Sequence, residues 1–157
     1  MFKNLDKYDI RQAMSWVEMP ELRKPGAPMA RILVKPATEA NTAYYNAMLK
    51  MSGKRIRAMA KTDAITAEDA AASRDDDAVL YPLYVIHHWE HIDGEGDDLD
   101  EGGFVPFNRA HAKKLCALLN EKAPHLLDRL RNEAATTERF YGEDEIAPPD
   151  ADELAEN

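Results

Sequence analysis

Three histidines in the segment His87-His-Trp-Glu-His91 are the residues whose types and spacing could do metal chemistry. On a helix, His87 and His91 would lie one turn apart, the spacing from which two imidazoles can hold one metal ion. The metalloprotease order His-Glu-x-x-His is absent, and the chain lacks the Pro-Cys-x-x-Cys that supplies the thiolates of zinc deaminases. The sequence therefore favours partly buried or rim histidines, and a metal-dependent enzyme using His87 and His91 is the weaker alternative.

Two further stretches have the composition of ligand loops without the required spacing. The acids that begin at Asp93 resemble a calcium loop, but its sixth position is Asp98 rather than glycine and its twelfth is Phe104 rather than glutamate. Ser52-Gly-Lys-Arg55 lacks the upstream glycine and the following serine or threonine of a phosphate loop. No spacing indicates a nucleophile with its base and orienting acid, so the sequence predicts neither a catalytic site nor a bound cofactor.

The chain is acidic, with a net charge of -9 over 157 residues, and this charge is unevenly placed. Phosphate binding depends on clustered lysine and arginine, so the balance argues against nucleic acid or an anionic membrane as the principal partner. Residues 143–157 have few large apolar side chains, which predicts a disordered acidic tail after a single domain over 1–142. The acids of that tail are Glu143, Asp144, Glu145, Asp150, Asp152, Glu153 and Glu156.

The single cysteine and the lengths of the apolar runs indicate the cellular compartment of the protein. Cys116 lies among leucines, which favours a small buried hydrophobic side chain over a reactive thiol. No apolar run approaches the roughly eighteen residues of a membrane-spanning helix, and the first residues lack the apolar stretch of a signal peptide. We therefore expect a cytoplasmic protein.

The elements that position these residues are organised around the apolar stretch 79–92. Large side chains occupy nearly every face of a helical wheel there, which favours a helix covered on most sides and kinked or restarted at Pro82. A strand is the alternative, because Tyr, Val, Ile and Trp favour strands. We expect Trp89 to anchor the core, and we expect a loop over the acids and glycines of 93–103.

Local signals predict a hairpin and a long helix before this stretch. Runs 15–19 and 29–35 are β-prone and are separated by prolines and a glycine, which is typical of a hairpin with a long loop. Thr38 is expected to cap a helix that begins near Glu39 and reaches about Lys61. A two-stranded ribbon is marginal alone, so this hairpin must pack on helices.

Further capping signals complete the predicted fold. Thr66 is expected to open an alanine-rich helix that reaches about Arg74, and the three aspartates 75–77 are expected to break it or to cap the next helix. Asn108 and Pro124 are expected to open two more helices. The predicted fold is mainly α, a small domain of about four to five helices with an N-terminal β-hairpin packed on it.

The helix after Thr38 has the most marked charge pattern of the chain. On one face, at three- and four-residue steps, stand the apolar residues expected to face the core: Tyr45, Met48, Leu49, Ile56 and Met59. On another face, at the same spacing, stand the basic residues Lys50, Lys54, Arg57 and Lys61. Such a stripe indicates either a docking surface for an acidic partner or nucleic acid, or a solvated helix face. We take these four residues as the candidate partner-binding site.

Several short motifs also occur in a fixed order between residues 29 and 140. They are Arg31-Ile-Leu-Val-Lys-Pro36 with Asn41 and Tyr44-Tyr45, then Trp89 followed by Ile92-Asp-Gly94, then Val105-Pro-Phe-Asn108 before a leucine-rich helix, and finally Arg139-Phe140. In this order the motifs resemble those of the tail assembly chaperones of long-tailed bacteriophages.

The resemblance implies a non-enzymatic role in tail morphogenesis and virion assembly. It implies that the chain binds the long, largely helical tape measure protein in the host cytoplasm, keeps it soluble and recruits tail tube subunits, with self-association as a further possibility. Methionine-rich surfaces suit reversible binding of apolar helix faces, and Met14, Met19, Met29, Met48, Met51 and Met59 lie in the first half. The alternative is another small cytoplasmic adaptor or virion structural protein.

Overall fold

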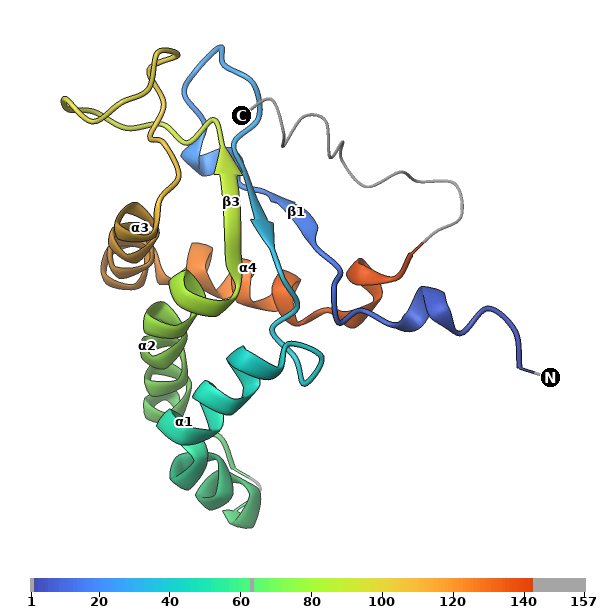
Figure 1. Cartoon of the computed structure of the whole chain (residues 1–157). Helices are drawn as coiled ribbons and strands as arrows, with labels where there is room; N and C mark the ends of the chain where they lie inside the picture. Colours follow the sequence, from blue (N-terminus) through green and yellow to red (C-terminus); the bar gives the residue numbers. More distant parts are fainter. Residues whose placement is uncertain (1, 63, 143–157) are drawn as a thin grey trace.

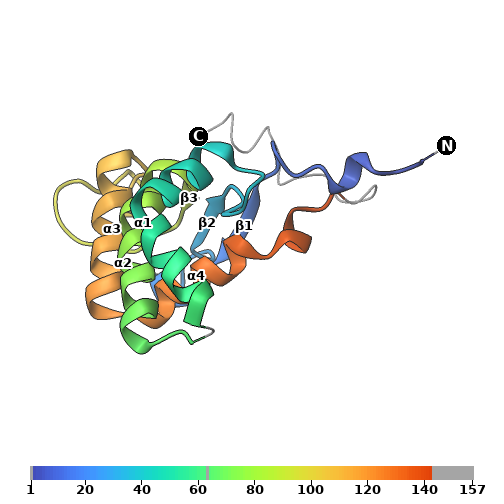
Figure 2. The same cartoon turned by 90° about the horizontal axis from the view of Figure 1, so that it is seen from below.

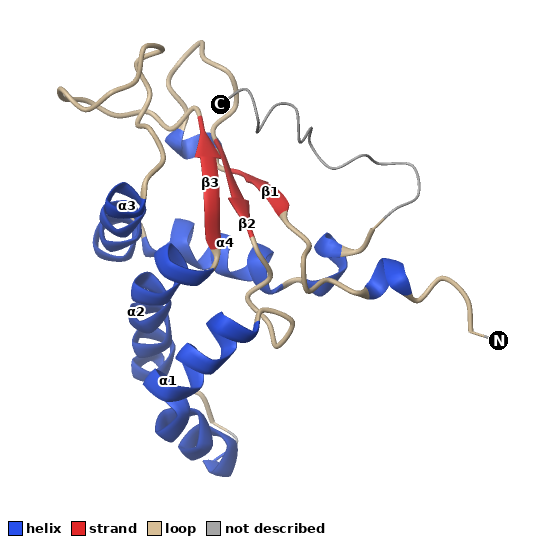
Figure 3. Cartoon of the chain, in the orientation of Figure 1, coloured by secondary structure: helices blue, strands red, loops and turns tan. Residues whose placement is uncertain are grey.

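The computed structural model describes residues 2–62 and 64–142. Within them, four α-helices pack with one three-stranded antiparallel sheet (Figure 1, Figure 3). The strands are β1 (Ser15–Glu18), β2 (Arg31–Val34) and β3 (Ile86–Glu90), and the helices are α1 (Thr42–Thr62), α2 (Ala67–Tyr84), α3 (Arg109–Lys122) and α4 (Pro124–Ala135). Short 3-10 helices cover Asp6–Tyr8, Pro20–Leu22 and Thr137–Phe140. The helical character and the N-terminal hairpin are as predicted, and a third strand extends the hairpin into a sheet.

The sheet has β2 at its centre, with β1 and β3 on either side. Val17, Ile32 and Trp89 are partners across the three strands and are all buried. Because side chains alternate between the faces of a strand, these three lie on one face, while Trp16 and His88 lie on the other. The sheet therefore buries one face against the helices, while on the other face Leu33 is buried and Trp16 and His88 are half-buried.

The third strand corrects the prediction of a helix over 79–92. The helical interpretation is wrong for 86–90, which pairs antiparallel with β2, and the strand alternative is right there. α2 runs through Pro82 and ends at Tyr84, so the helix neither stops nor restarts at the proline. Val85 caps the helix, and β3 begins at Ile86, a buried β-branched residue of the kind that favours strands.

The predicted break at aspartates 75–77 is also wrong, since α2 runs through them as one helix. Its start is as expected. The Thr66 hydroxyl accepts from the Asp69 backbone N–H at 3.1 Å, and the Asp69 carboxylate accepts from the Thr66 backbone N–H at 3.3 Å. Asp76 and Asp77 do not interrupt the helix because arginines from α1 and α4 bind them. Tertiary partners thus override the low helix propensity of aspartate.

α1 begins three residues later than the expected start near Glu39. Thr38 forms a turn ahead of the helix, where its hydroxyl accepts from the Ala40 N–H at 3.2 Å. Asn41 then acts at the helix start, because its side-chain oxygen accepts from the Tyr44 N–H at 3.2 Å and its amide donates to the Tyr84 carbonyl at 2.9 Å. The second bond ties the start of α1 to the end of α2.

α2 is the central helix of the arrangement. It packs against α1, α3, α4 and β3. Figure 2 shows α1, α2 and α3 as neighbours on one side of the molecule, with the sheet and α4 on the other. The expected openings of the last two helices are confirmed: Asn108 accepts from the His111 N–H at 2.7 Å, and Pro124 occupies the first turn of α4. One hydrophobic core extends from Ile10 to Phe140 and contains Leu126, Leu127 and Leu130 of α4.

The predicted disordered tail, 143–157, lies outside the described residues. Ahead of it, Phe140 is buried, the Tyr141 ring contacts Tyr8 edge-on at 4.8 Å, and the Gly142 N–H donates to the Lys7 carbonyl at 2.9 Å. The packing that involves the C-terminal part of the chain therefore reaches at least to Gly142.

A chain that ends at Gly142 is expected to keep the melting temperature of the full-length protein, because it retains all of these contacts. A chain that ends at Ala135 provides the contrast, since it loses the buried Phe140 and is expected to melt at a lower temperature. Thermal unfolding followed by circular dichroism checks both. A clear drop for the longer of the two chains would show that residues after Gly142 contribute to stability.

Candidate partner-binding surface

α1 concentrates positive charge in an otherwise acidic chain. Its 21 residues include five basic side chains and no Asp or Glu. Four of the five, Lys50, Lys54, Arg57 and Lys61, are exposed, and their spacing places them on one face of the helix. We call this set the basic stripe. Within the described residues, none of the four forms an ion pair, so their charge faces solvent.

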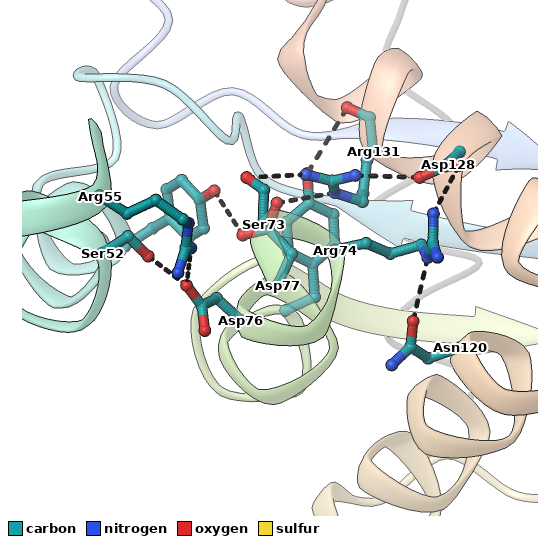
Figure 4. A network of polar contacts seen from close by, with 11 residues as sticks. Ser52, Arg55, Ser73, Arg74, Asp76, Asp77, Asn120, Asp128 and Arg131 are labelled. Carbon is teal, nitrogen blue, oxygen red and sulfur yellow. Dashed lines mark hydrogen bonds and ion pairs between the residues drawn. The ribbon is translucent and has the colours of Figure 1, made fainter. Parts of the chain in front are cut away.

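The fifth basic residue turns inward and explains how α1 is oriented. Arg55 pairs with Asp76 of α2, and the Ser52 hydroxyl donates to the same carboxylate (Figure 4). Tyr44, one of the buried residues of α1, donates its hydroxyl to Asp77 of α2 at 2.8 Å. These polar contacts fix which face of α1 lies against α2.

This orientation corrects the predicted inward face of α1. Leu49 is 44% exposed and Ile56 is 38% exposed, although the apolar spacing predicted both to face the core. Tyr45, Met48 and Met59, the other members of the predicted set, are half-buried. The face that packs on α2 is instead centred on the polar residues that bind Asp76 and Asp77. α1 therefore presents exposed apolar side chains next to the basic stripe.

A buried carboxylate holds this helix arrangement together. Asp77 is 7% exposed, and besides the Tyr44 hydroxyl it accepts from Nε of Arg131 on α4 at 2.8 Å. Arg131 also donates to Asp128 at 2.9 Å and to the Ser73 hydroxyl at 3.4 Å (Figure 4). A charge this far from water is tolerated because it is paired and hydrogen-bonded on both oxygens. The network links α1, α2 and α4 at one point.

The ionisation of the network follows from burial and from this pairing. Burial, and then the negative charge of Asp77, raise the pKa of Tyr44, so its hydroxyl stays protonated and donates. Burial opposes the charge of Arg131, but the bonds to Asp77 and Asp128 outweigh it and raise the pKa of that guanidinium. The arrangement is that of a fixed ion pair that positions helices.

The same network continues to α3 through Arg74. Its guanidinium contacts Asp128 at 3.3 Å and the Asn120 side chain at 3.1 Å (Figure 4). Asn120 also donates to Asp75 at 2.7 Å. The sequence prediction missed these residues. The sequence signal that could have indicated them is the run of three aspartates inside an alanine-rich segment. If a helix continues through such a run, the aspartates are expected to have partners on other elements.

The structure separates the two histidines that were considered as metal ligands. His87 and His91 lie at opposite ends of β3 rather than one helical turn apart, and four residues of strand span about 13 Å. His91 contacts the Met29 carbonyl at 3.3 Å, and His87 lies beside Lys35 and Arg109. Within 2–62 and 64–142, no group of three or more His, Cys, Asp or Glu side chains is placed to hold a metal ion.

The remaining candidates have local structural roles. Cys116 is fully buried, and burial raises the pKa of its thiol to about 12. In the acidic loop 93–103, the Asp100 carboxylate accepts from the Gly102 and Phe104 N–H groups, both at 2.9 Å, which turns the chain back toward α3. Among the described helices, none combines the length and apolar character needed to cross a bilayer.

Comparisons with models of protein families, with curated proteins and with solved structures gave no significant match to this chain. The candidate surface is therefore defined by the residues of α1 alone. It consists of the basic stripe together with the exposed Leu49, Met51 and Ile56 on the same helix.

Proposed function

We propose that the protein is a tail assembly chaperone that binds an amphipathic, acidic helical segment of a tape measure protein along α1. It keeps that partner soluble and recruits tail tube subunits during tail morphogenesis. The observation that carries the proposal is the exposed surface of α1, which carries both apolar side chains and four cations without ion-pair partners in the described structure. The order of motifs described above supplies the family and the partners.

The physical basis is the exposed surface that α1 leaves uncovered. α1 packs on α2 through its polar inward face, and its exposed apolar residues Leu49, Met51 and Ile56 are not part of the core. Exposed leucine, methionine and isoleucine on one helix are typical of a protein–protein contact, and methionine adapts to varied partners. A helical partner with its apolar face toward Leu49 and Ile56 would bring its flanking acids to the basic stripe. Such a partner would be shielded from aggregation while bound.

Reversal of two charges in the basic stripe tests the proposal. Co-expression with the neighbouring tape measure protein should give a soluble complex, and Lys54→Glu with Arg57→Glu should weaken it about tenfold, because attraction becomes repulsion at the interface. Wild-type binding should fall as salt rises, and this dependence should be reduced in the variant. The melting temperature should not change, since neither side chain has an ion-pair partner in the described structure.

Lys113→Glu with Lys114→Glu is the matched control, because it changes the net charge equally at two exposed positions of α3. It should leave the complex largely intact. If both pairs weaken the complex alike, the effect comes from overall charge rather than from α1. If the α1 reversal changes neither the affinity nor its salt dependence, the stripe is a solvated face and the proposed surface is wrong.

A further inference from the structure

A pocket of about 310 Å³ lies where the start of α1, the end of α2 and the start of β3 meet. Three of its lining residues, Lys35, His87 and Arg109, have basic side chains. Among the described residues that line it, none is Asp or Glu, and the other lining residues are neutral. The pocket is thus positive, on a chain whose net charge is -9.

The chain positions these basic groups without neutralising them. Arg109 donates through Nη1 to the Leu83 carbonyl at 2.8 Å and to the Pro82 carbonyl, which holds its guanidinium at the pocket while leaving its other N–H groups unused by described residues. Lys35 and His87 form no ion pair within the part of the chain that the structure describes. Burial, and then the charges of Lys35, His88 and Arg109, lower the pKa of His87, as expected of an imidazole that faces positive charge.

A second pocket of similar volume, beside β1 and α4, shows the opposite arrangement. Its Arg139 pairs with Glu133, which also lines it, and its Arg129 pairs with Glu21. The chain therefore supplies its own carboxylates to those arginines. At the pocket of Lys35, His87 and Arg109 no described residue supplies such a carboxylate, and a ligand can provide it.

The pocket and the basic stripe lie on the same face of α1. Ala43 belongs to its lining, and Lys50, Lys54 and Lys61 follow Ala43 at seven, eleven and eighteen positions, which keeps them close to the same face of α1. Ala43 and Lys61 are separated by about 27 Å along the helix axis. A partner lying along this face of α1 would therefore reach the pocket with one end.

We propose that this pocket binds one carboxylate of the partner that lies along α1, an inference that rests on the function proposed above. The carboxylate accepts from the free N–H groups of Arg109 and from the Lys35 ammonium, with His87 as the third donor. Charge-assisted bonds of this kind are stronger than bonds between neutral groups. The pocket would then fix the position of the partner along α1, while the stripe supplies attraction that depends little on register.

The test uses sodium acetate as the probe of the pocket, at constant ionic strength, on the full chain. Acetate should shift the NMR signals of the His87 ring in a saturable way. Lys35→Ala should weaken acetate binding about tenfold, and Lys122→Ala, an exposed lysine at the other end of α3 from Arg109, should change it less than about twofold. Lys35→Ala should also weaken the complex with the tape measure protein, and inorganic phosphate serves as a second probe.

Each result decides a separate question. If the His87 signals do not respond to acetate, or if Lys122→Ala weakens binding as much as Lys35→Ala, the pocket is not a carboxylate site, whatever the stripe reversal shows. If phosphate binds saturably and acetate does not, the ligand is a free phosphate rather than a carboxylate. If acetate binds but Lys35→Ala leaves the complex unchanged, the carboxylate does not come from the partner. Loss of the complex on stripe reversal alone would leave the proposed function standing.

Discussion

Replacing Trp89 with alanine is expected to lower the free energy of unfolding by about 3–5 kcal/mol, the range for a large aromatic side chain removed from a core. Trp89 is 3% exposed and lies opposite Ile32 on the buried face of the sheet. Its indole N–H donates to the Val105 carbonyl at 2.8 Å, and its ring meets Phe107 edge-on with centroids 5.1 Å apart. The substitution therefore removes core packing and a tie to the chain before α3 together.

Two variants separate these contributions in denaturant unfolding. Trp89→Phe keeps an aromatic ring but loses the bond to Val105, and a cost of about 2 kcal/mol is expected. Trp16→Ala, on the more exposed face of the sheet, should cost less than Trp89→Ala. Near-wild-type stability of Trp89→Ala would contradict the burial of this side chain and would make it a candidate partner contact.

Replacing Asp77 with alanine is expected to destabilise the protein by about 3–5 kcal/mol, because it removes the buried one of the two carboxylates that pair with the partly buried Arg131 guanidinium. Arg131 would lose the bond to its Nε, and the Tyr44 hydroxyl would lose its acceptor. Loss of these bonds would loosen the contact of α1 and α4 with α2. Chemical unfolding of the variant measures the cost directly.

Asp75→Ala is the matched control, since Asp75 is exposed and accepts from Asn120 alone. It should cost less than about 1 kcal/mol. Combining Asp77→Ala with Arg131→Met should recover part of the loss, because the guanidinium that lost its buried partner is then absent as well. If the double variant is less stable than Asp77→Ala by the full cost of a second lost contact, the ion pair is not what makes Asp77 important.

The parts of the fold that depend on neighbouring residues could be predicted from the sequence. The hairpin, the Thr66 capping box, the Asn108 cap and the Pro124 start all rest on signals within a few positions of the element they define. The buried Trp89 could also be predicted, because a large apolar side chain in the most apolar stretch has few other places to go.

The errors concern elements that are decided by distant partners. β3 is a strand because β2 is available to pair with it, and nothing within 79–92 carries that information. α2 continues through its aspartates because Arg55 and Arg131, on other helices, bind Asp76 and Asp77. In each case a tertiary contact outweighs a local preference.

The candidate site likewise has one part that could be predicted from nearby residues and another part that depends on distant contacts. The four residues of the basic stripe were predicted from spacing on one helix, and their exposure is as expected of such a face. The exposure of Leu49 and Ile56 was not predicted, because polar contacts to α2 decide how α1 is rotated about its axis. The pocket could not be predicted either, since Lys35, His87 and Arg109 come from three separate segments.

Along the chain, α1 and α2 come between the neighbouring strands β2 and β3, and this order has a consequence for folding on the ribosome. The chain leaves the ribosome from its N-terminus, so the β1–β2 hairpin is complete while β3 still waits for about 50 further residues, roughly 3–10 s of synthesis. During that interval the edge of β2 that later pairs with β3 is free, and the apolar side chains of Val17 and Ile32 are not yet buried by the rest of the core. Leu127 and Leu130 of α4 emerge later still. The core therefore closes only after almost the whole domain has been made, and folding is completed late in translation or after release.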